Sequence, residues 1–289
     1  MNKIIQFPHS RDGIPGLHKK TDKPISTKQH YRHFIKSPGQ YVDTSGKLIS
    51  DDLCFCGEWE MHASVTALNN NQFGFPKCVI TPDTLNSSGK VINSDPCVFG
   101  QEFKYYNCRQ SEKSKTLKNL TQGDIVIFGS VIDINTSKEF YVDTVFVVAE
   151  RIEYNTNNLS ALKAHLSDYD KFYDLSLKGL ECSKEDGSGN CCSSGAGCSS
   201  GDDLVLYKGA TFDNPVDGMY SFSPCQSASS NPLGFERIKI SQADFPELNP
   251  KHCRGIKVFK NEQSQHVWNV LHNRTISNKL FCGVQFDWP

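Results

Sequence analysis

Cysteines and glutamates alternate with bulky apolar residues in the segment LCFCGEWEM, residues 53–61. Residues two apart share one face of a β-strand, so a strand here would have two chemically different faces. The apolar face would hold Leu53, Phe55, Gly57, Trp59 and Met61. The opposite face would hold the groups able to do chemistry, which are Cys54, Cys56, Glu58 and Glu60.

Two interpretations of the thiol and carboxylate face stay open. It is either the solvated acidic face of a half-exposed strand or a functional face on which Glu58 or Glu60 acts as a ligand or as a general acid or base. A β-bulge at Gly57 would break the alternation and place Trp59 beside Glu58. The binding pocket that we predict depends on that bulge.

A second chemically unusual residue is Asp143, which stands in the middle of the apolar segment EFYVDTVFVV. A buried carboxylate is costly unless it is paired or hydrogen-bonded, so the sequence predicts a donor close to it. The donor is either an arginine or backbone amides in a structural pair, or a ligand whose exocyclic amine the carboxylate reads.

The segment NSDPCVFGQEFKYYNCRQ, residues 93–110, combines aromatic rings with amide and guanidinium groups. Such groups stack on a nucleobase and hydrogen-bond to its edge, although tyrosines on strands are more commonly packing residues. The predicted ligand-binding residues are Trp59, Tyr105, Tyr106, Asn107, Arg109 and Asp143.

Twelve cysteines favour buried or surface thiols, because a secretory signal is not evident and a disulfide scaffold is therefore not expected. Four of them lie in a Gly- and Ser-rich loop, residues 182–203, with the spacing C-x8-C-C-x5-C, which differs from the paired knuckles of zinc ribbons. We predict no cofactor and no metal, and keep a cysteine-ligated metal protein as the last alternative. The four loop cysteines are Cys182, Cys191, Cys192 and Cys198.

Alternating apolar runs and turn signals between residues 53 and 150 indicate a mainly antiparallel β core within an α+β fold. Residues 124–134 and 139–152 are apolar on both faces and predict a central hairpin. The basic stretch around His30–Lys36 is interpreted as a helix turn, and Leu162, Leu166, Tyr169 and Tyr173 predict an amphipathic helix over 160–175. We expect a β-rich domain over 1–155 with an N-terminal arm, and a closely packed second part over 156–289.

The segment from Asn107 to Ile152 resembles the core of PUA-like β-barrel domains, among them the ASCH and EVE relatives and the nucleotide-modification-associated domains. In those domains a Gly-Asp pair opens a strand after a short helical segment, as Gly123 and Asp124 do here. The resemblance implies a barrel or a strongly bent sheet and the binding of modified bases or RNA, in bacterial defence or nucleic-acid modification.

The net charge of −1 and the pI near 6.7 give no global attraction for nucleic acid or membranes, so any nucleic-acid contact must be local. No apolar run approaches the length of a membrane span, and we expect a cytoplasmic protein. The sequence does not determine its oligomeric state.

The sequence therefore predicts a protein that binds a nucleotide, or a modified or single-stranded nucleic acid. The alternative is an enzyme that cleaves a glycosidic or phosphoester bond with Glu58 or Glu60 as general acid or base.

Overall fold

The computed structural model describes most of the chain in separate stretches, which are residues 2–8, 11–12, 31–59, 63–68, 76, 78–82, 95–110, 115–134, 137–180, 203–248, 256–260 and 262–289. Glu60, Met61 and the cysteine-rich loop with Cys182, Cys191, Cys192 and Cys198 lie outside these residues. The predictions made for them stay predictions.

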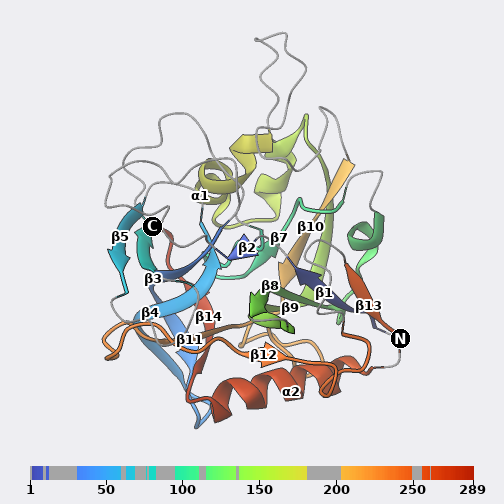
Figure 1. Cartoon of the computed structure of the whole chain (residues 1–289). Helices are drawn as coiled ribbons and strands as arrows, with labels where there is room; N and C mark the ends of the chain where they lie inside the picture. Colours follow the sequence, from blue (N-terminus) through green and yellow to red (C-terminus); the bar gives the residue numbers. More distant parts are fainter. Residues whose placement is uncertain are drawn as a thin grey trace.

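The described residues form mostly β-strands with a few helices, which confirms the α+β class with a sheet-rich core (Figure 1). The first sheet has the order β13-β1-β8-β9-β10-β7, and β12 also pairs with β9. Its strands are β1 (Ile4–Pro8), β7 (Lys104–Tyr105), β8 (Ile125–Ile134), β9 (Ser137–Asn155), β10 (Asp203–Gly209), β12 (Lys239–Ile240) and β13 (Lys257–Phe259).

The second sheet has the order β14-β11-β4-β3-β6-β5, and β2 pairs with β3. Because β14 pairs with both β11 and β3, the strands β3, β4, β11 and β14 close into a ring, which requires the sheet to bend. The strands are β2 (Arg11–Asp12), β3 (Tyr31–Val42), β4 (Leu48–Glu58), β5 (Ala63–Ala67), β6 (Cys78–Pro82), β11 (Ser223–Ser227) and β14 (Phe281–Phe286).

Both sheets combine strands from the two parts of the chain that the sequence separates at residue 155. The first sheet places β10 beside β9, and the second places β11 beside β4. Most pairings are antiparallel, and the parallel ones among the described strands are β1–β8, β2–β3 and β3–β6. A boundary at 155 therefore does not separate one sheet from the other.

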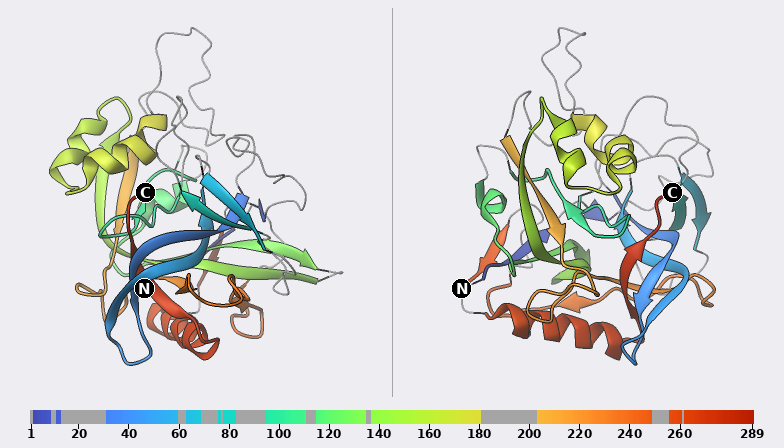
Figure 2. Two further views of the ribbon diagram at one scale, coloured as in Figure 1. Left: turned by 90° about the vertical axis from the view of Figure 1, so that its left-hand side faces the viewer. Right: turned by 180° about the vertical axis from the view of Figure 1, so that it is seen from behind.

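Helical elements cover two separate regions of the sheets (Figures 1 and 2). Helix α2 (Ser264–Ser277) packs through Val267, Trp268 and Leu271 in one hydrophobic cluster, which also holds Cys54 and Cys56. A series of short turns packs in the other cluster, with Phe55 and Trp59. These turns are η2 (Leu159–Ala164), α1 (Tyr169–Phe172), η3 (Tyr173–Leu177) and η4 (Lys178–Leu180), and η1 (Lys115–Asn119) lies earlier in the chain.

The predicted central hairpin is confirmed, since β8 and β9 pair from Ile125↔Val147 to Ile134↔Ser137 in the middle of the first sheet. Two other predictions are wrong. The basic stretch forms strand β3 instead of a helix turn, because Arg32 and Phe34 alternate with His33 and Ile35 across the sheet. The region 160–175 is a chain of short helical turns of different type instead of one helix.

The predicted parity of β4 is confirmed, but its acidic face is not solvated. Phe55 and Trp59 lie in one cluster while Cys54 and Cys56 lie in the other. All four are buried, and so is Glu58, because each face of the strand lies against one of the two hydrophobic clusters. The interpretation as a half-exposed strand is therefore wrong for residues 53–59, the part of this segment that the structure describes.

The bulge expected at Gly57 is absent, and a bulge occurs at another glycine. Pairing of β3 with β4 runs without a shift from Val42↔Leu48 to Arg32↔Glu58. In the hairpin, by contrast, Phe128 pairs with Thr144 and Gly129 pairs with Val142, so Asp143 is the extra residue. Gly57 and Gly129 are both isolated glycines within a strand, and either could mark a bulge by sequence alone. Only the strand pairing in the tertiary structure shows that the bulge lies opposite Gly129.

Replacement of Gly129 by alanine tests this assignment. A Cβ at Gly129 would overlap the carbonyl oxygen of Tyr141 and lie 2.8 Å from the ring of Phe140. Backbone atoms cannot move aside cheaply, so we expect Gly129→Ala to lower the free energy of unfolding by about 2 kcal/mol or more in urea titrations.

Gly57→Ala is the matched control. A Cβ at Gly57 would meet the ends of the Phe55 and Ile35 side chains at 3.1 and 3.2 Å, and these can shift. We expect a loss below about 1 kcal/mol. Equal losses for the two variants would contradict the bulge at Asp143.

Candidate functional site

Asp143 is fully buried at the bulge of β9 and lies between two arginines. Its Oδ1 accepts hydrogen bonds from Nε and Nη2 of Arg237, at 3.0 and 2.7 Å. Its Oδ2 lies 3.3 Å from Nε of Arg32. Nη2 of Arg237 also donates to Oγ of Ser130, at 2.6 Å. We call these four residues the Asp143 cluster.

Strand pairing places a further acidic residue, Glu58, beside Arg32 of the Asp143 cluster. Arg32 and Glu58 are directly opposite on β3 and β4, so their side chains leave the sheet on the same face. Both side chains are buried, Arg32 with 1% and Glu58 with 5% of its surface exposed. The predicted residues Glu58 and Asp143 are therefore brought close to one arginine.

Strand pairing explains why Arg237 reaches Asp143. The chain before β12 runs antiparallel to β9, with Ile240 opposite Phe140 and Lys239 opposite Tyr141. The amide of Val142 then donates to the carbonyl of Ile238, at 2.8 Å. The next residue along β9 is Asp143, and the next one back along the segment before β12 is Arg237. The bulge turns the carboxylate of Asp143 toward this guanidinium.

The Asp143 cluster is costly to bury. Removing charged groups from water carries a penalty of several kcal/mol per ion, and apolar residues of similar volume often stabilise a protein equally well. Apolar rings accompany both arginines in the chain, since Phe34 lies two residues from Arg32 and Phe235 two residues before Arg237. The two rings pack at a centroid distance of 4.9 Å. The presence of these buried ion pairs therefore does not imply that they stabilise the fold. We consider instead that they position Arg237.

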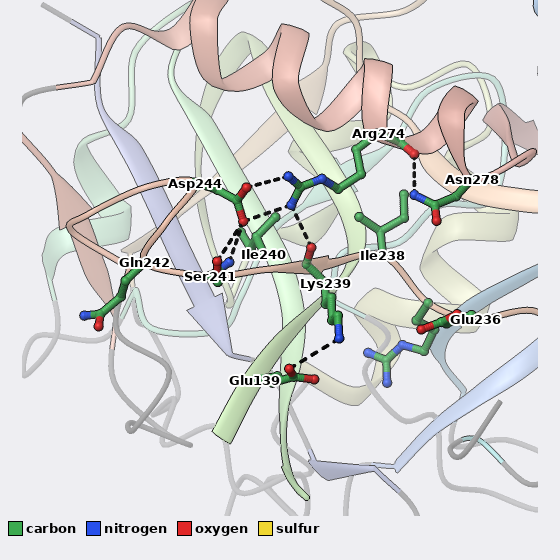
Figure 3. A pocket seen from close by; sticks show the side chains of 11 residues that line it. Glu139, Glu236, Ile238, Lys239, Ile240, Ser241, Gln242, Asp244, Arg274 and Asn278 are labelled. Carbon is green, nitrogen blue, oxygen red and sulfur yellow. Dashed lines mark hydrogen bonds and ion pairs between the residues drawn. The ribbon is translucent and has the colours of Figure 1, made fainter. Parts of the chain in front are cut away.

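Arg237 also lines an open pocket with a volume of about 640 Å³ (Figure 3). We call it the Arg237 pocket, and it is lined by residues 236–242, Glu139, Asp244, Arg274 and Asn278. These residues come from β9, the segment around β12, and the last turn of α2. Arg237 thus connects the buried cluster to a solvent-accessible cavity.

Two ion pairs link four other charged groups of the pocket, Arg274 with Asp244 and Lys239 with Glu139. Arg274 contacts both carboxylate oxygens of Asp244, and its Nη1 donates to the carbonyl of Lys239 at 2.9 Å. Arg274 lowers the pKa of Asp244 to about 2, mainly through these hydrogen bonds. Lys239 lies 3.4 Å from Glu139, whose second oxygen accepts from the hydroxyl of Tyr141 at 2.8 Å.

The predicted aromatic wall is part of the core. Tyr105 and Tyr106 have no exposed surface and Trp59 has 2%. Trp59 packs edge-on against Phe99 at 5.4 Å, and Tyr105 stacks on Tyr207 at 5.9 Å. The structure brings the three predicted rings into one hydrophobic cluster, where they act as packing residues.

The predicted polar residues next to these rings do not line the Arg237 pocket. Asn107 is buried, whereas Arg109 is exposed in a left-handed conformation with φ of 60°. The turn that contains them is held by Asp95, whose carboxylate accepts hydrogen bonds from the amides of Tyr106, Asn107 and Cys108 at 3.2, 3.3 and 2.7 Å. Their geometry indicates a structural turn.

Sequence reasoning missed Arg32, Ser130 and Arg237, as well as the whole lining of the pocket. The only available signal was the need of Asp143 for a donor, and an arginine was one of the predicted answers. Arg237 lies 94 positions away in the sequence, so no local pattern pointed to it.

The seven described cysteines are free thiols, and six of them are buried. Burial raises the pKa of Cys54 to about 12, and it raises the pKa of Cys225 well above its usual value. Within the described stretches, no group of three or more His, Cys, Asp or Glu residues is placed to hold a metal ion. The metal hypothesis therefore depends on the loop with Cys182, outside those stretches.

Asp143→Asn tests the energetic importance of the cluster. Removing one partner of a buried ion pair leaves uncompensated charge, so we expect the free energy of unfolding to fall by about 3–5 kcal/mol in urea titrations. The control is Asp170→Asn, which breaks an ion pair with Lys163 on the surface and should leave stability unchanged within error. Similar stability of both variants would show that the cluster is not a coupled ionic unit.

Thiol labelling tests the burial of the cysteines. Only thiolates react with iodoacetamide, and a raised pKa together with burial suppresses the thiolate. We expect Cys54, Cys225 and Cys282 to stay unmodified in the native protein at pH 8 and to react fully in denaturant, as measured by peptide mass spectrometry. Rapid native labelling of Cys54 would contradict its burial in the hydrophobic cluster that also holds α2.

No helix among the described residues is long and apolar enough to cross a membrane. Comparisons with known proteins give no further assignment: no protein-family model, curated protein or solved structure matches this chain.

Proposed function

We propose that this protein binds a nucleotide or a modified base, and that the Arg237 pocket is the binding site. The pocket volume of about 640 Å³ is in the range of small-molecule sites. Its walls offer guanidinium, ammonium, carboxylate, amide and hydroxyl groups, which match the mixture of donors and acceptors on a base and its sugar.

The observation that carries the proposal is the double role of Arg237. Its side chain is buried, is held by Asp143 and Ser130, and lies over the ring of Tyr141 with Cζ 5.3 Å from the ring centroid. A wall residue held in this way does not have to be ordered when a ligand binds, so little conformational entropy is lost. Positioning of Arg237 would also explain why a costly buried ion pair is present, which stability alone does not explain.

This site differs from the one expected from the sequence, which relied on Trp59, Tyr105 and Tyr106 for stacking. The Arg237 pocket instead contains the apolar side chains of Ile238 and Ile240 among polar groups. An open site of mixed polar and apolar surface binds weakly, and we expect a dissociation constant on the order of 0.1 mM for a nucleoside-sized ligand. A role in bacterial defence or nucleic-acid modification is part of the proposal.

The enzyme hypothesis is the second candidate, and one observation favours it. Glu58 is buried on the face that also holds Arg32 and the ion pairs of Asp143. A buried carboxylate near arginines is a candidate general acid or base. Glu58 does not line the Arg237 pocket, and therefore base binding in that pocket does not require it.

An NMR titration tests the proposal. We expect a panel of nucleosides, nucleotides and modified oligonucleotides to contain ligands that shift the amide signals of residues 236–242 and of Arg274 and Asn278. Lys239→Ala removes a pocket ammonium and should weaken that binding about threefold or more.

Lys163→Ala provides the control, because this exposed lysine lies in η2, at the opposite end of the molecule from α2 (Figure 1). It should bind as tightly as the wild type. Absence of signal changes for every ligand at millimolar concentration, or changes confined to residues away from the pocket, would refute the proposal.

A further inference from the structure

The charges of the Arg237 pocket limit what part of a nucleotide it can hold. The lining contains three cationic and three acidic side chains, so it has no net positive charge. Each cation already faces a carboxylate: Arg237 faces Asp143, Arg274 faces Asp244, and Lys239 faces Glu139. A site for a phosphate dianion would require cations without such partners.

Glu236 is the acidic residue left over. Glu236 is exposed, lines the pocket, and precedes Arg237 in the chain. The described residues provide it with no hydrogen bond or ion pair (Figure 3). Figure 3 shows it on the same side of the pocket as Lys239 and Glu139, away from the pair of Arg274 with Asp244. An ionised carboxylate only accepts hydrogen bonds, so it selects ligands with N–H donors.

Replacement of a carboxylate by a phosphate as the partner of a pocket cation would not make the pocket favourable for phosphate. The pair of Lys239 with Glu139 is exposed and contributes little to stability, so a phosphate could displace Glu139. The released carboxylate would then remain beside the phosphate and repel it. An amino group on the ligand meets no such penalty, because Glu236 lacks a cation in the described structure.

We propose that the Arg237 pocket selects a nucleobase that has an exocyclic amino group, with Glu236 as the specificity-determining acceptor, and that it does not bind phosphate. The inference rests on the proposed function and names the ligand class of that same site. Glutamate accepts from amino groups of bases in known recognition modes, for example from N4 of cytosine. Any sugar phosphate of the ligand remains outside the pocket.

Matched ligand pairs test the inference by isothermal titration calorimetry. Adenosine is compared with purine riboside, which lacks the 6-amino group, and cytidine with 2-pyrimidinone riboside, which lacks the 4-amino group. In at least one pair we expect the amino-bearing nucleoside to bind about five- to tenfold more tightly. The corresponding 5′-monophosphate should bind no more tightly than the nucleoside.

Glu236→Ala should reduce that preference to about twofold or less while the protein keeps its melting temperature, since Glu236 is exposed. Glu153→Ala, which changes an exposed glutamate on β9 whose partner is Arg151, is the matched control and should keep the preference. NMR chemical-shift changes of the amides of residues 236–242 on addition of nucleoside would show that the nucleoside occupies the pocket.

The outcomes separate the two proposals. Equal affinities within both pairs, a preference that survives Glu236→Ala, or tighter binding of the monophosphate would overturn the inference and leave base binding intact. Failure of every nucleoside and nucleotide to bind at millimolar concentration would instead overturn the proposed function, and the inference with it.

Discussion

The ion pairs of Asp143 are the constraint on which the candidate site depends. One buried carboxylate on a bulge of β9 contacts Arg32 of β3 and Arg237 of the segment before β12, and therefore joins the first sheet to the second. Both the bulge and the close strand contact require a glycine at position 129, because a side chain there would overlap the neighbouring strand. Backbone geometry and buried charge are thus specified together.

Arg237 transmits this constraint to the surface. Because its guanidinium is fixed from the buried side, the wall of the pocket is formed before any ligand arrives. The other cations of the pocket are fixed in a different way, through partners that are themselves partly exposed, as Arg274 is through Asp244. Each cation of the pocket faces a carboxylate, so the site offers a hydrogen-bonding pattern without net positive charge. This balance is the basis on which we propose an uncharged base as ligand in preference to a phosphate.

Residue patterns predicted several elements correctly where local chemistry decides the structure. The hairpin of β8 and β9 was predictable because both of its strands are apolar on both faces, and the parity of Phe55 and Trp59 against Cys54 and Cys56 followed from a period of two. The interpretation of the basic stretch of β3 as a helix turn was wrong, because a run of charged residues does not reveal a buried strand face. Arg32 is in fact buried, and its charge is balanced by a residue more than one hundred positions away.

The sequence by itself determined the α+β class, the central hairpin, and the need of Asp143 for a donor, since each follows from the burial preferences of neighbouring residues. Only the tertiary structure decided that the donors are Arg237 and Arg32, that the bulge lies at Gly129 instead of Gly57, and that Tyr105 and Tyr106 belong to the core. The reason is physical. These outcomes depend on which strands meet across the two sheets, and the pairing of distant segments is not encoded in any local period of the chain.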